Sequence, residues 1–126
     1  LDTYASMQGR AERIRERLHD CLAEFPAATG KIVAGYGAPA KLTTLAAFCG
    51  LDVDDLAWVQ DTTAAKQGLY LPGTAIPIVA PAADGRRPSA YLLAAHNYAG
   101  PILRQESQFT AAGGRWILPF PEPVIL

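Results

Sequence analysis

The chain has 126 residues, half of them hydrophobic, which is enough for one domain with a buried core. Eleven basic and twelve acidic side chains give a net charge of −1, and so weak a field excludes general binding to nucleic acid or to an anionic membrane surface. No apolar run approaches the roughly 20 residues of a membrane span, and no charged-then-apolar leader opens the chain. We therefore expect a soluble, cytoplasmic protein.

The first long pattern in the chain is helical. From Met7 to Phe25, apolar residues recur every three or four positions with Arg and Glu between them, and Pro26 ends the pattern. Residues 1–26 are thus expected to form a leading helix. Because the chain begins with Leu1 and stops on an apolar run, we interpret it as a domain excised from a longer protein.

The rest of the chain alternates between short apolar runs and helical patterns. Five strands are expected, at residues 31–34, 56–60, 76–79, 90–95 and 115–118. Two further helices are expected, at residues 41–49 and at about 98–112. A loop rich in Gly and Pro separates the second and third strands.

The pattern of the strands predicts the fold class. They are apolar almost throughout rather than alternating, which suits a parallel sheet covered on both faces. We therefore predict one α/β domain over residues 1–126, Rossmann-like and three-layered, with a mostly parallel five-stranded sheet. Right-handed crossovers favour the strand order 3-2-1-4-5, with a topological switch point between the first and fourth strands.

The two cysteines give no sign of a metal or disulfide framework. Cys21 and Cys49 lie on the apolar faces of two expected helices, and no second Cys or His stands near either at ligand spacing. We expect both to be reduced core thiols and predict no metal site.

The turn after the first strand has the form of a phosphate-binding motif. In "GYGAPAK", residues 35–41, Gly35, Gly37 and Ala40 fit the spacing G-x-G-x-x-A, and Pro39 suits the first turn of a helix. Lys41 would oppose the helix dipole unless an anion lies there too. The motif therefore indicates a bound phosphate, and the alternative is a structural turn beside a solvated lysine.

No cofactor signature is complete in this chain. Asp61 ends the second strand 24 residues after Gly37, where dinucleotide folds place the acid that binds a ribose, which favours a nicotinamide site. However, the second βαβ half is missing, and residues 62–73 form a long loop instead of a helix. An S-adenosylmethionine site is no better supported, because no acid precedes the glycine turn and its third glycine is replaced.

Several stretches together resemble a known family. They are "GYGAPAK" at 35–41, "KQGLYLPGTAIPI" at 66–78, Asn97, and "GGRWILPFPEPVIL" at 113–126. In this order they resemble the C-terminal domain of C-methyltransferases that act on nucleotide-linked deoxysugars. The resemblance implies a zinc-binding N-terminal domain and a central domain that holds S-adenosylmethionine. It also implies that this Rossmann-like domain helps to form the cleft for the nucleotide sugar.

The resemblance and the strand ends together give ten candidate binding residues. Those assigned to a turn that faces the phosphates of the acceptor are Gly35, Tyr36, Gly37, Ala38 and Lys41. Those assigned to the cleft are Asp61, Lys66, Gln67, Tyr70 and Asn97. Asn97 follows the fourth strand, so we expect it to face Lys41 across the switch point. The catalytic residues are expected in the preceding domain.

Other polar and aromatic residues have simpler interpretations. His19 is expected to be solvated on the leading helix, and Arg86 and Arg87 are expected to form a solvated pair rather than a diphosphate clamp. His96 could be a base, a phosphate donor or a structural residue. The residues expected to pack in the core or between domains are Trp58, Trp116 and Phe120.

The sequence thus predicts the acceptor-binding domain of an S-adenosylmethionine-dependent C-methyltransferase, with a nucleotide-linked keto sugar as acceptor. In such a reaction a base removes a proton next to the ketone, and the enolate carbon attacks the sulfonium methyl. The resemblance implies that the base and the methyl donor belong to the preceding domain, so this chain alone is expected to be inactive. The alternative is a stand-alone nucleotide-binding module, NAD-like or regulatory, without catalysis.

Overall fold

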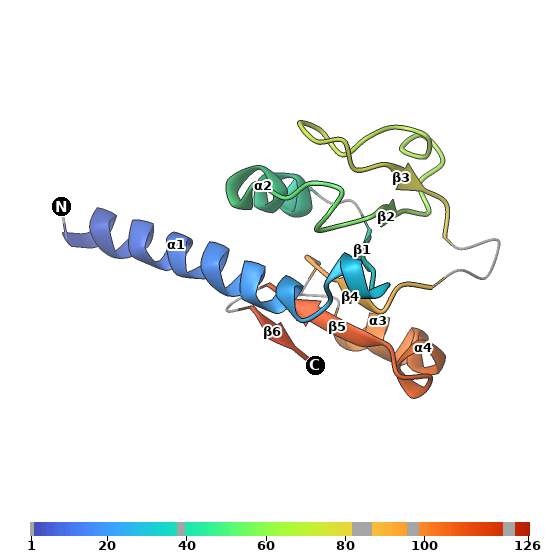
Figure 1. Cartoon of the computed structure of the whole chain (residues 1–126). Coiled ribbons are helices and arrows are strands. Elements are labelled where there is room, and N and C mark those ends of the chain that lie inside the picture. The colour runs from blue at the N-terminus through green and yellow to red at the C-terminus, as the bar shows by residue number, and fades with distance from the viewer. Residues whose placement is uncertain (1, 38–39, 82–86, 96–98, 120–122) are drawn as a thin grey trace.

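The computed structural model describes residues 2–37, 40–81, 87–95, 99–119 and 123–126 (Figure 1). The helices are α1 (Asp2–Ala23), a 3-10 turn η1 (Ala27–Thr29), α2 (Ala40–Cys49), α3 (Ala99–Gln105) and α4 (Ser107–Ala111). The strands are β1 (Val33–Tyr36), β2 (Val59–Gln60), β3 (Ile78–Val79), β4 (Ala90–Leu92), β5 (Arg115–Leu118) and β6 (Val124–Ile125).

The strands form a single sheet in the order β3-β2-β1-β4-β5-β6. The first five of these are parallel, which confirms the α/β class and the predicted order of those strands. The prediction of five strands is wrong, because β6 adds an antiparallel edge strand to β5. β6 has only two residues and follows a proline-rich stretch, so it carries neither length nor periodicity by which a sequence pattern could reveal it.

The last predicted helix is interrupted. Residues 98–112 were expected to be one helix, but α3 ends at Gln105 and α4 begins at Ser107. Glu106 lies between them with φ −102° and ψ 28°, outside the helical range. Neither Pro nor Gly stands at residues 102–112, so the sequence gives no signal for this break.

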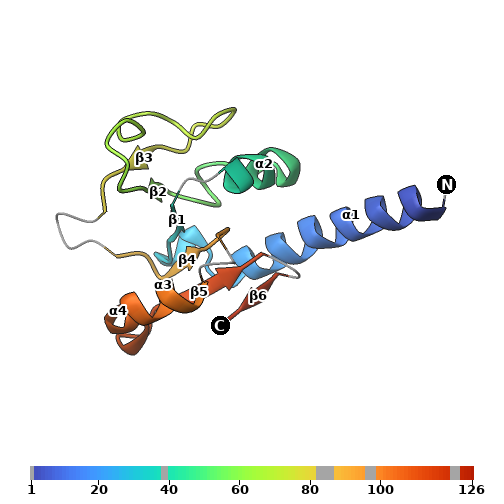
Figure 2. The same cartoon turned by 180° about the vertical axis from the view of Figure 1, so that it is seen from behind.

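Helices pack on both faces of the sheet (Figures 1 and 2). Alternate residues of a strand point to opposite faces, so the sheet contributes to two separate cores. On the α1 and α2 face the buried side chains include Leu18, Leu42, Leu56, Val59, Leu92 and Ile117. On the α3 and α4 face the buried side chains are Ala34, Trp58, Tyr91, Leu93, Phe109 and Trp116. The prediction that Trp58 and Trp116 pack in a core is confirmed.

Close packing of α2 onto the sheet depends on a glycine. A Cβ at Gly35 would lie 2.8 Å from Val59 Cγ2 and 3.2 Å from Leu42 Cδ2. Gly35 therefore has a packing role beneath α2. Two residues later, Gly37 has φ +81°, a conformation that glycine adopts at little cost.

The leading helix is anchored to α2 by a side chain that the sequence placed in solvent. His19 is partly buried, and its Nε2–H donates to the carbonyl oxygen of Cys49 at 2.7 Å. The expectation of a solvated His19 is therefore wrong, because this imidazole satisfies a carbonyl at the carboxyl end of α2. Cys49 is buried, Cys21 is half-buried against the same core, and both thiols are free. No helix in the described part of the chain is long and apolar enough to cross a membrane.

Candidate ligand-binding cleft

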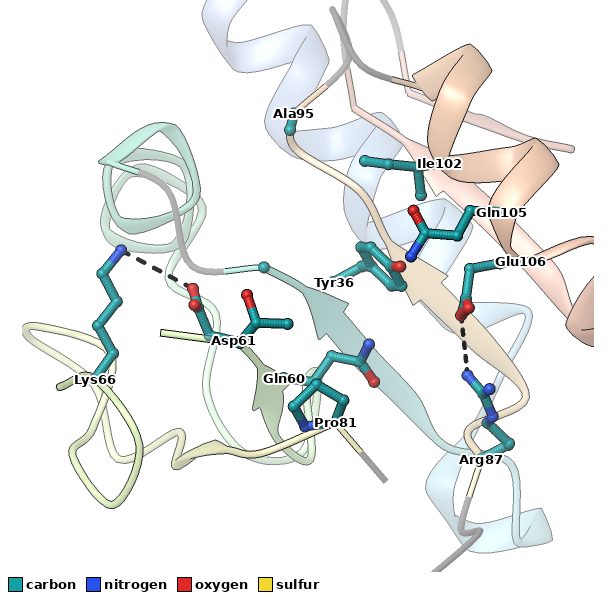
Figure 3. A pocket seen from close by; sticks show the side chains of 12 residues that line it. Tyr36, Gln60, Asp61, Lys66, Pro81, Arg87, Ala95, Ile102, Gln105 and Glu106 are labelled. Atoms are coloured by element: carbon teal, nitrogen blue, oxygen red, sulfur yellow. Dashed lines mark hydrogen bonds and ion pairs between the residues drawn. The ribbon is translucent and has the colours of Figure 1, made fainter. Parts of the chain in front are cut away.

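A cleft of about 510 Å³ opens on the α3 side of the sheet (Figure 3). Tyr36 and Gln60, which end β1 and β2, lie side by side in the sheet and both line the cleft. Residues of α3, Ile102 and Gln105, line it from one side. The segment between β2 and β3, residues 61–77, contains turns but no helix, so the cleft is left beside α3 rather than filled.

The structure brings four of the predicted site residues together. Tyr36, Gly37, Asp61 and Lys66 all line this cleft, although they come from separate segments of the chain. Gln67 lies next to them, and its Nε2–H donates to the backbone carbonyl of Asp61 at 2.8 Å. The carboxyl end of β2 and the loop that follows it therefore form one rim of the cleft.

Other predicted site residues lie elsewhere. Gly35 is buried under α2, and Tyr70 is 62% exposed where it bridges to Pro77. Lys41 lines a different groove, between α1 and α2, together with Ile14 and Phe48. Ala38, Asn97 and His96 lie outside the described residues, as do Arg86 and Phe120. The predicted juxtaposition of Lys41 and Asn97 therefore stays a prediction.

The carboxylate of Asp61 is held at the rim by local contacts. Its Oδ1 accepts a hydrogen bond from the backbone N–H of Thr63 at 2.8 Å. Its Oδ2 lies 3.9 Å from Lys66 Nζ, and the Lys66 side chain is 45% exposed. The loop thus leaves the Lys66 ammonium group partly exposed at the cleft, and Figure 3 shows it extending toward the Asp61 carboxylate.

A second polar group, formed by Arg87, Glu106, Tyr91 and Gln60, lies at the other end of the cleft, and of these only Arg87 is singled out by the sequence. Arg87 Nη1 donates to Glu106 Oε2 at 3.1 Å and to the Tyr91 hydroxyl at 3.2 Å. The Tyr91 hydroxyl donates in turn to Gln60 Oε1 at 2.7 Å. The guanidinium of Arg87 is thus held by these two groups while its side chain stays 46% exposed, and the expectation of a solvated pair with Arg86 stays a prediction, because Arg86 lies outside the described residues.

Burial favours the protonated form of two phenols in this region. Loss of solvation raises the pKa of the Tyr91 hydroxyl above its ordinary value of 10.0, and the hydrogen bond from Arg87 opposes this in part. Loss of solvation also raises the pKa of Tyr36. Both hydroxyls are therefore neutral at physiological pH, and that of Tyr91 donates to Gln60 Oε1.

The charged groups among the described lining residues balance. Asp61 lies beside Lys66, and Glu106 is paired with Arg87 (Figure 3). The described residues contain no group of three or more His, Cys, Asp or Glu that could hold a metal ion. Aromatic and amide groups with paired charges form a surface suited to binding a polar organic molecule.

Fold and cleft together define an α/β domain with a polar cleft beside its sheet, and comparison with known proteins places this domain in a family. Residues 1–121 match the family described as C-methyltransferase C-terminal domain, and the chain belongs to that family. It is also similar to the C-methyltransferase NovU of Streptomyces niveus, with 46% identity over 124 residues. That match covers 98% of this chain but only 29% of NovU, so the chain spans less than a third of this relative. These findings do not favour the stand-alone nucleotide-binding module.

Proposed function

We propose that this chain is the acceptor-binding domain of an S-adenosylmethionine-dependent C-methyltransferase and that its acceptor is a nucleotide-linked keto sugar. The observation that carries the proposal is the meeting of Tyr36, Gly37, Asp61 and Lys66 in one cleft of a domain from this family. The much greater length of NovU supports a preceding domain that binds the methyl donor.

In this proposal the chain binds and orients the acceptor. The preceding domain supplies the base that removes a proton next to the ketone and the methyl group that the enolate carbon attacks. Lys66 at the mouth of the cleft offers a cation to the phosphates of the acceptor, and Gly37 allows them to approach the backbone closely. The contribution of this domain to the rate is positioning.

The test compares lysine variants of the whole methyltransferase, assayed with a thymidine diphosphate-linked keto sugar. Lys66→Met should raise the KM for this acceptor roughly 10-fold or more, because a charge-assisted hydrogen bond is lost. The KM for S-adenosylmethionine should stay nearly unchanged. Lys31→Met is the matched control, since Lys31 is exposed and lines a different hollow. A Lys66→Met enzyme that loses affinity for the methyl donor but keeps its acceptor KM would contradict the proposal.

Lys41 gives a second, independent comparison. The sequence predicts that it contacts the acceptor phosphates, whereas its side chain lines the groove between α1 and α2. Lys41→Met should raise the acceptor KM by a similar factor if the phosphates extend to the first turn of α2. An unchanged KM would restrict the phosphate site to the Lys66 side of the cleft.

A further inference from the structure

The Gln60 side chain is an unusual group for the floor of a cleft. It is only 7% exposed, and Tyr91 donates to its Oε1 at 2.7 Å. No described group accepts a hydrogen bond from its Nε2. A buried amide N–H without an acceptor costs free energy, so such a group indicates a bound partner.

The hydrogen-bonded chain fixes which way this amide points. A guanidinium can only donate, so Arg87 must donate to the Tyr91 oxygen. The single hydroxyl hydrogen of Tyr91 is then left for Gln60, which must present its oxygen there. Glu106 holds the guanidinium of Arg87 from the other side. The Nε2 of Gln60 is therefore the atom available to the cleft.

The sheet is built to allow this contact. β1 lies between β2 and β4, so Tyr91 must reach across a whole strand to meet Gln60. The β1 residue paired with Tyr91 is Ala34, whose methyl group leaves room for the phenol ring to cross. Tyr36, the next β1 residue on this face, packs edge-on against Tyr91 with ring centroids 5.2 Å apart. Figure 3 shows Tyr36 and Gln60 bordering the same space.

The Gln60 end of the cleft is better suited to a neutral ligand group than to a charged one. The Gln60 donor is uncharged, and Arg87, the cation linked to it through Tyr91, is already paired with Glu106. A phosphate would find no unpaired cation among the described residues here, whereas a carbonyl oxygen needs only a neutral donor. The half-buried Tyr36 ring offers a surface against which a flat or cyclic group can lie.

We propose that Gln60 Nε2 is a fixed hydrogen-bond donor for a carbonyl oxygen on an uncharged ring of the acceptor, with Tyr91 and Arg87 as its positioning residues. That carbonyl belongs either to the nucleobase or to the keto sugar. The inference rests on the proposed function and adds to it a subsite that hydrogen-bonds a carbonyl group of the acceptor.

The experiment measures binding of three probes to the whole methyltransferase by calorimetry. They are thymidine diphosphate, a thymidine diphosphate-linked keto sugar and ribose 5-phosphate, which has neither the nucleobase nor the keto sugar. Gln60→Leu should weaken binding of the keto-sugar probe roughly 3- to 10-fold and leave ribose 5-phosphate unchanged. Gln60→Glu keeps the size and the acceptor for Tyr91 but removes the donor, so it should weaken binding at least as much. Gln108→Leu, at an exposed position of α4, is the matched control.

The outcomes separate the two sources of the carbonyl. Equal weakening of both thymidine probes assigns the nucleobase, and weakening of the keto-sugar probe alone assigns the ketone. Unchanged affinity for both thymidine probes, or equal weakening of all three probes, would overturn the inference while leaving the proposed function standing. A wild-type enzyme that binds neither thymidine probe would overturn the proposed function and this inference with it.

The positioning role has its own readout. In the wild-type background, Tyr91→Phe should weaken binding of the keto-sugar probe roughly 2- to 5-fold, because the Gln60 amide is no longer fixed. It should have no effect on the affinity of the Gln60→Leu variant, since the donor through which Tyr91 acts is gone. A merely structural role for Tyr91 would give the same loss of affinity in both backgrounds.

Discussion

The two faces of the sheet are buried in different ways. Under α1 and α2 the core is almost wholly aliphatic, with one buried thiol, whereas under α3 and α4 it consists mainly of aromatic rings. The aromatic face also carries the hydrogen-bonded chain from Arg87 through Tyr91 to Gln60. The aliphatic face is thus closed by its helices, whereas the aromatic face is incompletely covered and carries the cleft that we propose binds the acceptor.

The difference between the two faces can be seen within a single strand. In β1, Val33 and Gly35 face the aliphatic core, and Ala34 and Tyr36 face the aromatic one. A helix pressed onto Gly35 closes one face, while the loop after β2 leaves the other face open over β1 and β2. Residues adjacent in sequence therefore serve different purposes, and substitutions should separate stability from binding.

The largest expected effect is on the aliphatic face. Leu42→Ala removes a fully buried side chain of α2 and should lower the free energy of unfolding by about 2–5 kcal/mol. The acceptor KM should not change, because Leu42 lies on the face opposite the cleft. Urea unfolding and steady-state kinetics measure the two effects, and Phe48→Ala, at a 44% exposed position of the same helix, is the control. A rise in acceptor KM for Leu42→Ala would show that the aliphatic face also affects acceptor binding, contrary to the proposed division between the two faces.

The next effect tests the close approach of α2. Gly35→Ala places a methyl group against Val59 and Leu42 and should cost about 1–3 kcal/mol of unfolding free energy through overpacking. In Gly100→Ala the new methyl group meets only Arg104 Nη1, at 3.5 Å, so that helical position should tolerate or favour alanine. Chemical denaturation of both variants gives the comparison. Equal stability of the two variants would show that Gly35 is not needed for packing.

The sequence predicted the fold better than the site. Apolar runs are local signals, so they predicted the five parallel strands, and the handedness of the crossovers predicted the order of those five. The break at Glu106 and strand β6 depend on tertiary contacts, and no local signal marks either. The pairing of β6 with β5, for example, appears only when residues 117 and 125 are brought together.

The site divides in the same way. Tyr36, Gly37, Asp61 and Lys66 follow strand ends or a glycine turn, and both are visible in the sequence. From the sequence, Gln60 is only the last residue of a strand. Its hydrogen bond to Tyr91 could not be predicted, because Tyr91 lies 31 residues away and across another strand. A glutamine at the end of the buried run "LAWVQ" was the one available signal.

A smaller effect on the aromatic face should appear at high pH. Because burial raises the pKa of Tyr91 above 10.0, the folded state holds this proton more tightly than the unfolded chain does. The resulting stabilisation is complete at pH values below the pKa of Tyr91 in the unfolded chain. It is lost as the pH rises through the pKa of Tyr91 in the folded state. Urea unfolding at about pH 8 and about pH 11 should show a larger loss of stability for the wild type than for Tyr91→Phe. Equal losses would mean that Tyr91 ionises as freely in the folded state as in the unfolded chain.

The smallest effect on stability is expected at the mouth of the cleft. Lys66 lies 3.9 Å from the Asp61 carboxylate, and its side chain is 45% exposed while that of Asp61 is 10% exposed. Because the separation is long and the cation is open to solvent, we expect this pair to contribute at most about 1 kcal/mol. Lys66→Met should therefore unfold within about 1 kcal/mol of the wild type, although we expect its acceptor KM to rise roughly 10-fold. Denaturant titration and kinetics on one preparation measure both, with Lys31→Met as the reference for removing a surface charge. A Lys66→Met protein that is strongly destabilised while its acceptor KM is unchanged would make Lys66 a structural residue of the loop, and the cleft would lose the cation that we assign to the phosphates.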